Sequence, residues 1–376
     1  MNRDSRKHLY DVHSWAGFVV GIALLIVCMS GAAAVFSPEI DRMANPALQV
    51  RPGQPVRIDA DRALATLQAA TPPDAEPAVR LSLQLPHAGL PGLYGLMFKT
   101  DAGYTYAYLD AANGSLRPPR SNQVNDFLRH LHVRLLYDRL PVGIVGVFML
   151  ISIVTGLLIY KHILRDMFRM RWRRIGNVRV TFADFHKLVG FWALLFHIAI
   201  ATTGTWLALE GYLKPVIAGV AGAEPRARGE GEERAFPADG RKLQSIAPMI
   251  RKARASIADF EPTHATIDYG GKHPTVRIDG NVPGLVQENA SHVRFDGLTG
   301  RIEKVYDVRQ QSFWTQFRYA LEPIHYGYYG GFWLKLLYLI VGLMPAALSI
   351  TGTLLWFERR KQAERPARTK SLERRA

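Results

Sequence analysis

The chain has 376 residues, of which 48% are apolar, and its formal net charge at pH 7 is +15. Four stretches of 21 to 25 residues carry almost no charge, and an α-helix of that length crosses the roughly 30 Å of hydrocarbon in a bilayer. This pattern excludes a soluble globular protein. It predicts membrane helices over residues 16–36, 140–160, 188–209 and 333–357.

The surplus positive charge lies beside these segments. Residues 1–14, 161–181 and 358–376 together hold 18 Lys and Arg against 6 Asp and Glu, whereas the rest of the chain holds 29 against 26. Basic flanks mark the cytoplasmic ends of membrane helices, and no nucleic-acid-binding motif accompanies them. We therefore expect both termini in the cytoplasm, membrane lipid as a partner and no nucleic acid. The two long connections then lie on the far side of the membrane.

The chain repeats itself. YDVHSWAGF before the first segment matches FADFHKLVGF before the third, and IVTGLLIYK in the second resembles SITGTLLWF in the fourth. A further histidine precedes the second and fourth segments at the same distance. The matched residues are His13 with His186, Gly17 with Gly190, Ser30-Gly31 with Thr203-Gly204, Thr155-Gly156 with Thr351-Gly352, and His132 with His325.

The two long connections also correspond. Each opens on an Ala-rich amphipathic stretch, at residues 59–70 and 241–256, and continues in short runs typical of strands. Each closes on an Asp-containing turn followed by Asn-Gly or Thr-Gly, in AYLDAANGSL and VRFDGLTGRI. Each connection is therefore expected to be an α+β domain.

The predicted fold is thus a membrane α-helical protein, with four transmembrane helices in two parallel helix–domain–helix repeats and two α+β domains. Because both halves begin in the cytoplasm, an axis along the membrane normal relates them. The expected boundaries are a flank and first helix at 1–36, a domain at 37–139, a helix at 140–160, a basic loop at 161–181, a helix at 182–209, a domain at 210–332 with a flexible linker at 222–240, a helix at 333–357 and a basic tail at 358–376.

Histidines at membrane helices are costly and are functional candidates. A twofold axis brings equivalent residues together, so His13 is expected to face His186 near the cytoplasmic side, and His132 to face His325 at the opposite side. Two opposed imidazoles suit the two axial positions of a haem iron. The single cysteine, Cys28, excludes covalently attached haem and iron–sulfur clusters. We therefore predict two b-type haems.

Other assignments of the histidines stay open. His197 lies eleven residues after His186, on the same helix face, and either ligates the outer haem or lies beside a porphyrin without binding iron. Zinc is the alternative metal, although no Cys or carboxylate joins the histidine pairs. Four histidines of the two connections are expected at surface or turn positions, and they are His87, His264, His273 and His292. His130 is a neighbour of His132 that has no partner in the repeat.

The H-x-x-x-G openings, the T-G closings and the two D-x-x-x-G turns together resemble the PepSY-associated transmembrane family, over nearly the whole chain. Within that family the chain is similar to bacterial inner-membrane ferric-siderophore reductases, including the ferrioxamine type. The resemblance implies PepSY-like domains in the periplasm and haem-dependent electron transfer to a periplasmic ferric siderophore. It also implies that His13, His132, His186 and His325 bind the haems, and His197 lies outside the family pattern.

The electron donor stays open between a separate cytoplasmic reductase and a membrane quinol, because the cytoplasmic flanks are too short for a flavin domain. Reduction releases iron, since the oxygen ligands of a siderophore bind Fe(II) less tightly than Fe(III). Two other functions are alternatives. One is a non-enzymatic membrane protein whose PepSY-like domains bind or restrain a periplasmic partner such as a peptidase, and the other is an accessory subunit of a transporter.

Overall fold

The computed structural model describes residues 2–373, apart from 51–52, 73, 77–79, 88–89, 101–102, 121–122, 161–177, 221–242 and 286–287. The chain divides into two compact units. The membrane unit comprises Met1–Phe36, Asp126–Ala223 and Ile324–Ala376, and the sheet unit comprises Ser37–Asn125 and Glu224–Pro323. Most of the expected basic loop at 161–181 and all of the expected linker at 222–240 lie outside the described residues.

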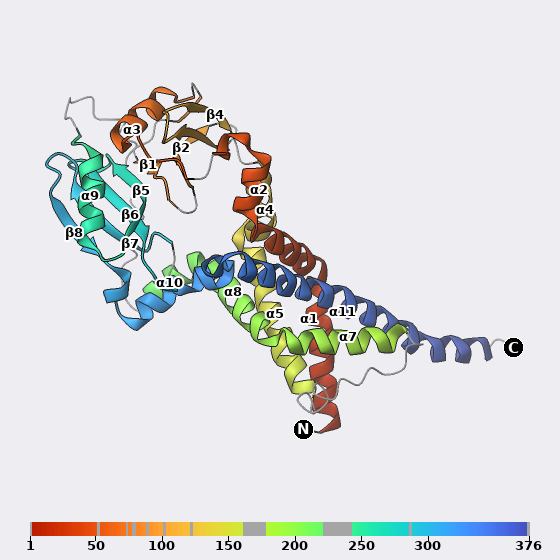
Figure 1. Cartoon of the computed structure of the whole chain (residues 1–376). Coiled ribbons are helices and arrows are strands. Elements are labelled where there is room, and N and C mark those ends of the chain that lie inside the picture. Colours follow the sequence, from red (N-terminus) through yellow and green to blue (C-terminus); the bar gives the residue numbers. More distant parts are fainter. Residues whose placement is uncertain are drawn as a thin grey trace. The chain divides into compact units, whose positions relative to one another are not determined.

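Long apolar helices form the membrane unit (Figure 1). Four described helices are long and apolar enough to cross a bilayer, over Arg3–Ala34, Arg139–Ile159, Leu194–Val216 and Tyr328–Gln362, and each contains most of one predicted segment. The helices that contribute to this unit are α1 (Arg3–Ala34), α4 (Gln123–Arg134), α5 (Arg139–Ile159), α7 (Val178–Trp192), α8 (Leu194–Val220), α10 (Phe313–Tyr326), η3 (Tyr328–Gly330) and α11 (Gly331–Glu373).

The third predicted helix differs from the expectation. Residues 182–209 were expected to be one helix, whereas α7 ends at Trp192 and α8 begins at Leu194, with Ala193 between them. Helical hydrogen bonds still continue through the interruption, because Ala193 N donates to Val189 O over 3.1 Å and His197 N donates to Ala193 O over 2.8 Å. The interruption is therefore local, and the helical hydrogen bonding continues from α7 into α8.

Small and aromatic residues bring the spans together. Ser349 Oγ on α11 donates to the carbonyl of Gly21 on α1 over 2.5 Å. The rings of Phe18 and Trp356 stack between the same two helices, with centroids 3.8 Å apart. Such close approach through small residues and interhelical hydrogen bonds is the usual basis of helix association in lipid, where apolar burial contributes little.

The sheet unit contains one eight-stranded sheet, in the order β4-β3-β2-β1-β5-β6-β7-β8, and every neighbouring pair is antiparallel. Its elements are α2 (Ser37–Ala44), η1 (Pro46–Leu48), α3 (Ala60–Ala69), β1 (Arg80–Gln84), β2 (Leu93–Thr100), β3 (Gly103–Asp110), β4 (Leu116–Arg120), α9 (Ile246–Ser256), β5 (Glu261–Asp268), β6 (Thr275–Asn281), β7 (Ser291–Asp296), β8 (Ile302–Tyr306) and η2 (Val308–Gln310). Figure 1 shows α9 lying along the strands of the second connection, β5 to β8.

This sheet corrects the expectation of two separate domains. Each connection supplies a helix followed by strands, as expected, and the strands number four in each. However, β1 of the first connection pairs with β5 of the second, with Leu83 opposite Ala265. The pairing covers two strand edges that separate domains would leave open to aggregation. A local pattern in the sequence does not reveal a pairing between segments so far apart.

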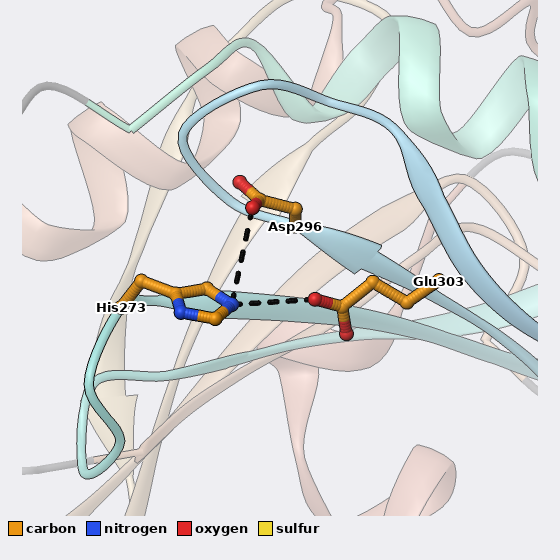
Figure 2. Close-up of side chains that lie close together, drawn as sticks. All are labelled: His273, Asp296 and Glu303. Atoms are coloured by element: carbon orange, nitrogen blue, oxygen red, sulfur yellow. Dashed lines mark hydrogen bonds and ion pairs between the residues drawn. The ribbon is translucent and has the colours of Figure 1, made fainter.

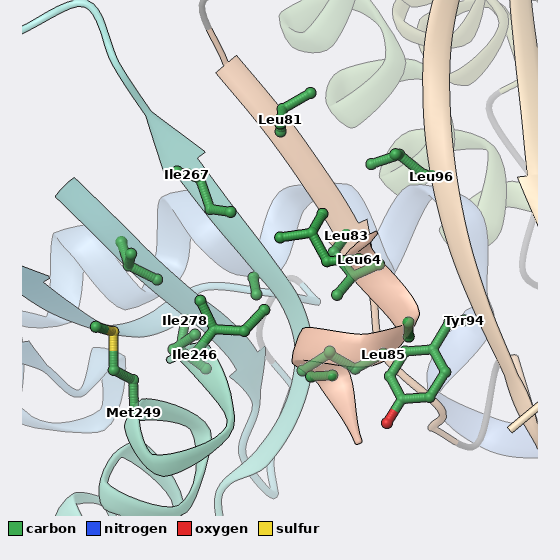
Figure 3. Packing of buried hydrophobic residues seen from close by; sticks show 14 of the residues in the cluster. Leu64, Leu81, Leu83, Leu85, Tyr94, Leu96, Ile246, Met249, Ile267 and Ile278 are labelled. Carbon is green, nitrogen blue, oxygen red and sulfur yellow. The ribbon is translucent and has the colours of Figure 1, made fainter. Parts of the chain in front are cut away.

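One hydrophobic core also joins the two segments (Figure 3). Leu67 on α3, Leu83 on β1, Ile246 on α9 and Ile267 on β5 are all less than 2% exposed and belong to the same cluster. Asp61 of α3 caps the other segment's helix, because its carboxylate accepts from the backbone N–H of Ile246 over 2.7 Å. An acidic group at a helix N-terminus satisfies free N–H groups and favours the helix dipole.

Both predicted turns are confirmed. In the first, Gly114 N donates to Asp110 O over 2.8 Å, and in the second, Gly300 N donates to Asp296 O over 2.9 Å. Gly114 has φ +75° and Gly300 has φ +66°, a region that glycine enters without the steric cost of a Cβ atom.

Because the core is shared, a cavity at its centre is expected to loosen both segments. Leu83→Ala is expected to lower the stability of the sheet unit by about 2–5 kcal/mol. Hydrogen exchange measured by mass spectrometry should then show faster exchange in β1–β4 and in β5–β8 together. Ser82→Ala, on the opposite face of β1, is the control and should change neither. Loss of protection in β1–β4 alone would contradict the single core.

Candidate functional site

The structure brings the four repeated histidines together as two pairs within the membrane unit. The rings of His13 on α1 and His186 on α7 have centroids 6.3 Å apart, and their planes stand at 89°. The rings of His132 on α4 and His325 on α10 have centroids 5.9 Å apart, with planes at 32°. We call these the first pair and the second pair.

In the first pair, each imidazole contacts a threonine on a membrane helix through Nδ1. His13 Nδ1 lies 3.0 Å from Ser152 O and 3.1 Å from Thr155 Oγ1, both on α5. His186 Nδ1 lies 2.9 Å from Thr351 Oγ1 on α11. Both threonine hydroxyls donate to the carbonyl four residues earlier in their own helix, over 2.7 and 2.9 Å. The hydroxyl oxygens therefore accept from the Nδ1–H groups.

The second pair follows the same rule. His132 Nδ1 lies 2.7 Å from Val27 O on α1, and a carbonyl can only accept. His325 Nδ1 lies 3.0 Å from Thr203 Oγ1 on α8, whose hydroxyl donates to the carbonyl of Ala199 over 2.7 Å. In the neutral form of all four histidines the proton is thus on Nδ1, and Nε2 keeps a lone pair.

Glycines make room for the rings of the second pair. A Cβ atom on Gly31 would lie 2.6 Å from His132 Nδ1, and one on Gly204 would lie 2.7 Å from His325 Cε1. Both distances are shorter than the van der Waals contacts of packed side chains. Each imidazole of the second pair therefore rests directly on a helix backbone.

The first pair is less tightly enclosed. A Cβ atom on Gly156 would lie 3.3 Å from His13 Cε1, and one on Gly352 would lie 3.4 Å from His186 Cε1. One helical turn after His13, a Cβ atom on Gly17 would meet no atom within 4 Å. The surface of α1 at Gly17 is therefore open.

His197 is set apart from both pairs. Its side chain is 2% exposed, and its Nε2 has no hydrogen-bond partner among the described residues. No ring contact joins it to another histidine in the described chain. An unsatisfied buried polar atom costs about 1–3 kcal/mol, which a group outside the polypeptide would recover by binding it.

The spacing of both pairs fits two imidazoles on one metal ion. A metal–imidazole nitrogen bond is about 2.0 Å long, and a five-membered ring with bonds of about 1.33 Å has atoms about 1.1 Å from its centre. Two such ligands on opposite sides of one ion therefore have ring centres about 6 Å apart. Hydrogen bonds from Nδ1 to a carbonyl or hydroxyl are the usual support of a metal-binding histidine.

The described residues hold one group of three side chains with metal-binding atoms close together, and it lies outside the membrane unit. Figure 2 shows His273 between two carboxylates, with Nε2 at 3.9 Å from Asp296 Oδ2 and 3.3 Å from Glu303 Oε1. These three groups account for one another as an exposed ion-pair cluster. No carboxylate joins either membrane pair to form a group of this kind in the part of the chain that the structure describes, so a purely imidazole donor set remains.

Comparison with known proteins places this chain in a family. The family model of the PepSY-associated TM region matches residues 10–359, a range that includes the four paired histidines and His197. The chain belongs to this family. It is a membrane protein, and the resemblance seen in its histidine and glycine motifs is confirmed at the level of the family. A relative, the uncharacterized protein PA4219 of Pseudomonas aeruginosa, is 28% identical over 266 residues, which cover 66% of this chain and 67% of the relative.

The sequence predicted which histidines meet, but not what holds them. The repeat identifies Gly31, Gly156, Gly204 and Gly352 only as matched positions, whereas each lies against an imidazole. The signal was present in the residue before each glycine, since a Ser or Thr stands there in all four cases. Its hydroxyl oxygen contacts the histidine directly in three of the [S/T]-G motifs, and in the fourth the carbonyl of Val27 takes that place.

Substitution of Gly31 and of Gly17 should distinguish a glycine that lies against an imidazole from one that faces open space. Gly31→Ala is expected to displace His132 and to lower stability by about 1–3 kcal/mol through overpacking. Gly17→Ala fills open space on the same helix and should keep or raise stability, because alanine favours helix by about 0.8–1 kcal/mol. Thermal unfolding in detergent, followed by circular dichroism, measures both. Equal melting temperatures for the two variants would contradict the packing of His132 against Gly31.

Proposed function

We propose that this protein is a di-haem reductase of the bacterial inner membrane. It passes electrons from the cytoplasmic side or the quinol pool to a ferric siderophore in the periplasm and so releases Fe(II) for iron uptake. His13 and His186 hold one b-type haem, and His132 and His325 hold the other. The single observation that carries the proposal is the pair of facing imidazoles at each of two levels of one helix bundle.

The two levels support transfer across the bilayer. Along α1, His13 and the glycine that supports His132 are 18 residues apart in one continuous helix. At 1.5 Å per residue this corresponds to about 27 Å, close to the roughly 30 Å thickness of the hydrocarbon core. The pairs thus lie near opposite faces of the membrane, with His197 at an intermediate level on α8.

The polypeptide supplies position and protonation state. Each Nδ1–H is fixed by an oxygen of a neighbouring helix, so that each Nε2 lone pair is available to iron without loss of a proton. Bound haem would supply one-electron redox chemistry, and the protein around it sets its potential. His197, with its free Nε2, lies beside the path between the pairs as a polar neighbour and not as one of the four paired ligands.

The charge pattern supports the direction. The basic flanks support a topology in which the termini and the first pair lie on the cytoplasmic side and the sheet unit lies in the periplasm. In this topology a ferric siderophore receives its electron at the second pair. One electron converts Fe(III) in the chelate to Fe(II), which oxygen ligands bind less tightly, and the chelator itself is neither cleaved nor oxidised.

The test combines haem content with electron delivery. His132→Ala and His325→Ala are each expected to lose one of two haems and to reduce ferric siderophore at least about 100-fold more slowly, since removal of a ligand abolishes its site. His130→Ala is the matched control, because His130 is an exposed neighbour on α4 that has no ring contact with another histidine among the residues that the structure describes. Reduction is followed anaerobically by trapping Fe(II) with a coloured chelator. Full haem content and full rate in both paired-histidine variants would contradict the proposal.

A further inference from the structure

A third histidine pair lies outside the membrane spans. His87, in the connection that follows β1, and His264, on β5, have ring centroids 6.2 Å apart, with planes at 47°. This spacing falls between those of the two membrane pairs. The repeat does not match these two residues with each other, so no pattern in the sequence predicts that they meet.

The nitrogen atoms of this pair are arranged as in the membrane pairs. His87 Nδ1 lies 2.7 Å from Leu85 O, a carbonyl that can only accept. His264 Nδ1 lies 3.2 Å from Thr263 Oγ1, whose hydroxyl donates to Asn289 Oδ1. Both rings thus carry the Nδ1 proton in the neutral form. His264 also has a side-chain hydrogen bond with Asn289, the residue that Thr263 contacts. Within the described part of the chain, the ring atoms with a measured distance to a polar partner are the two Nδ1 atoms.

The pair lies beside a hydrogen-bonded backbone and is partly exposed to solvent. His264 is opposite Gln84 in the β1–β5 pairing, on the face of the sheet away from α3 and α9, while its neighbour Ala265 points into the core. Leu85 N donates to Thr263 O over 2.7 Å, so a backbone hydrogen bond joins the two strands next to the histidines. Both imidazoles are partly exposed, which lets an ion enter.

We propose that His87 and His264 bind a divalent first-row transition-metal ion through their Nε2 atoms, with water completing the coordination. Imidazole suits this class of ion, and a carbonyl or hydroxyl partner on Nδ1 is the usual support of such a ligand. The site differs from the His273 cluster, where the free imidazole nitrogen already faces two carboxylates.

Fe(II) belongs to the class of ion that this site accepts. A connection to iron release rests on the proposed function, since the site would then receive the ion that reduction frees from the chelate. The metal site itself does not depend on haem or on reductase activity. Its test is therefore made with Zn(II), which has no redox chemistry.

Zinc binding is measured on the purified full chain in detergent at pH 7.5, by isothermal titration and by metal analysis after dialysis. His87→Ala and His264→Ala are each expected to lose one equivalent of zinc or to bind it at least about tenfold more weakly. His273→Ala is the control and should keep that equivalent. His87→Cys should restore binding, because a thiolate is also a zinc ligand. Circular dichroism verifies that each variant is folded.

Three outcomes would overturn the proposal. They are unchanged zinc binding in both alanine variants, loss of the same equivalent in His273→Ala, and failure of a folded His87→Cys variant to restore binding. Haem content is measured in the same samples. A wild-type protein that lacks haem but still binds zinc at this pair would contradict the reductase proposal and leave the metal site standing. A wild-type protein that holds haem but binds no zinc at this pair would contradict the metal site and leave the reductase proposal standing.

Discussion

The hydrogen bond from a histidine Nδ1–H to an oxygen of a neighbouring membrane helix is the interaction on which the membrane unit depends. A buried imidazole without such a partner is costly, and its position and tautomer are undetermined. Thr155, Thr203 and Thr351 already use their hydroxyl hydrogens within their own helices. Each can therefore only accept, so one arrangement of donors and acceptors fixes the rings and leaves the opposite nitrogen free.

Contacts between the two halves of the chain also build the sheet unit. There the strand pair β1–β5 joins the two connections, and Asp61 of one caps the α9 helix of the other. Residues from both halves then share one core, and His87 and His264, one from each half, lie in ring contact. A chain with two similar halves thus forms composite features that neither half contains, both in the membrane and in the sheet.

The sequence was sufficient wherever the signal was local or repeated. Hydropathy located the four spans, the Asp-x-x-x-Gly pattern located both turns, and the repeat predicted that His13 meets His186 and that His132 meets His325. It was insufficient where distant segments choose a partner. Three features depend on tertiary packing, which no short sequence pattern encodes. They are the β1–β5 pairing, the interruption at Ala193 and the contact of His87 with His264.

The central claim is that the two membrane pairs each hold a haem. The most direct measurement is a dithionite-reduced minus oxidised absorption spectrum of the detergent-purified wild-type protein from haem-replete cells, with quantification as the pyridine haemochrome. The account predicts b-type bands and two haems per chain. A spectrum without haem bands would contradict it, and the imidazole pairs would then require another metal or another role.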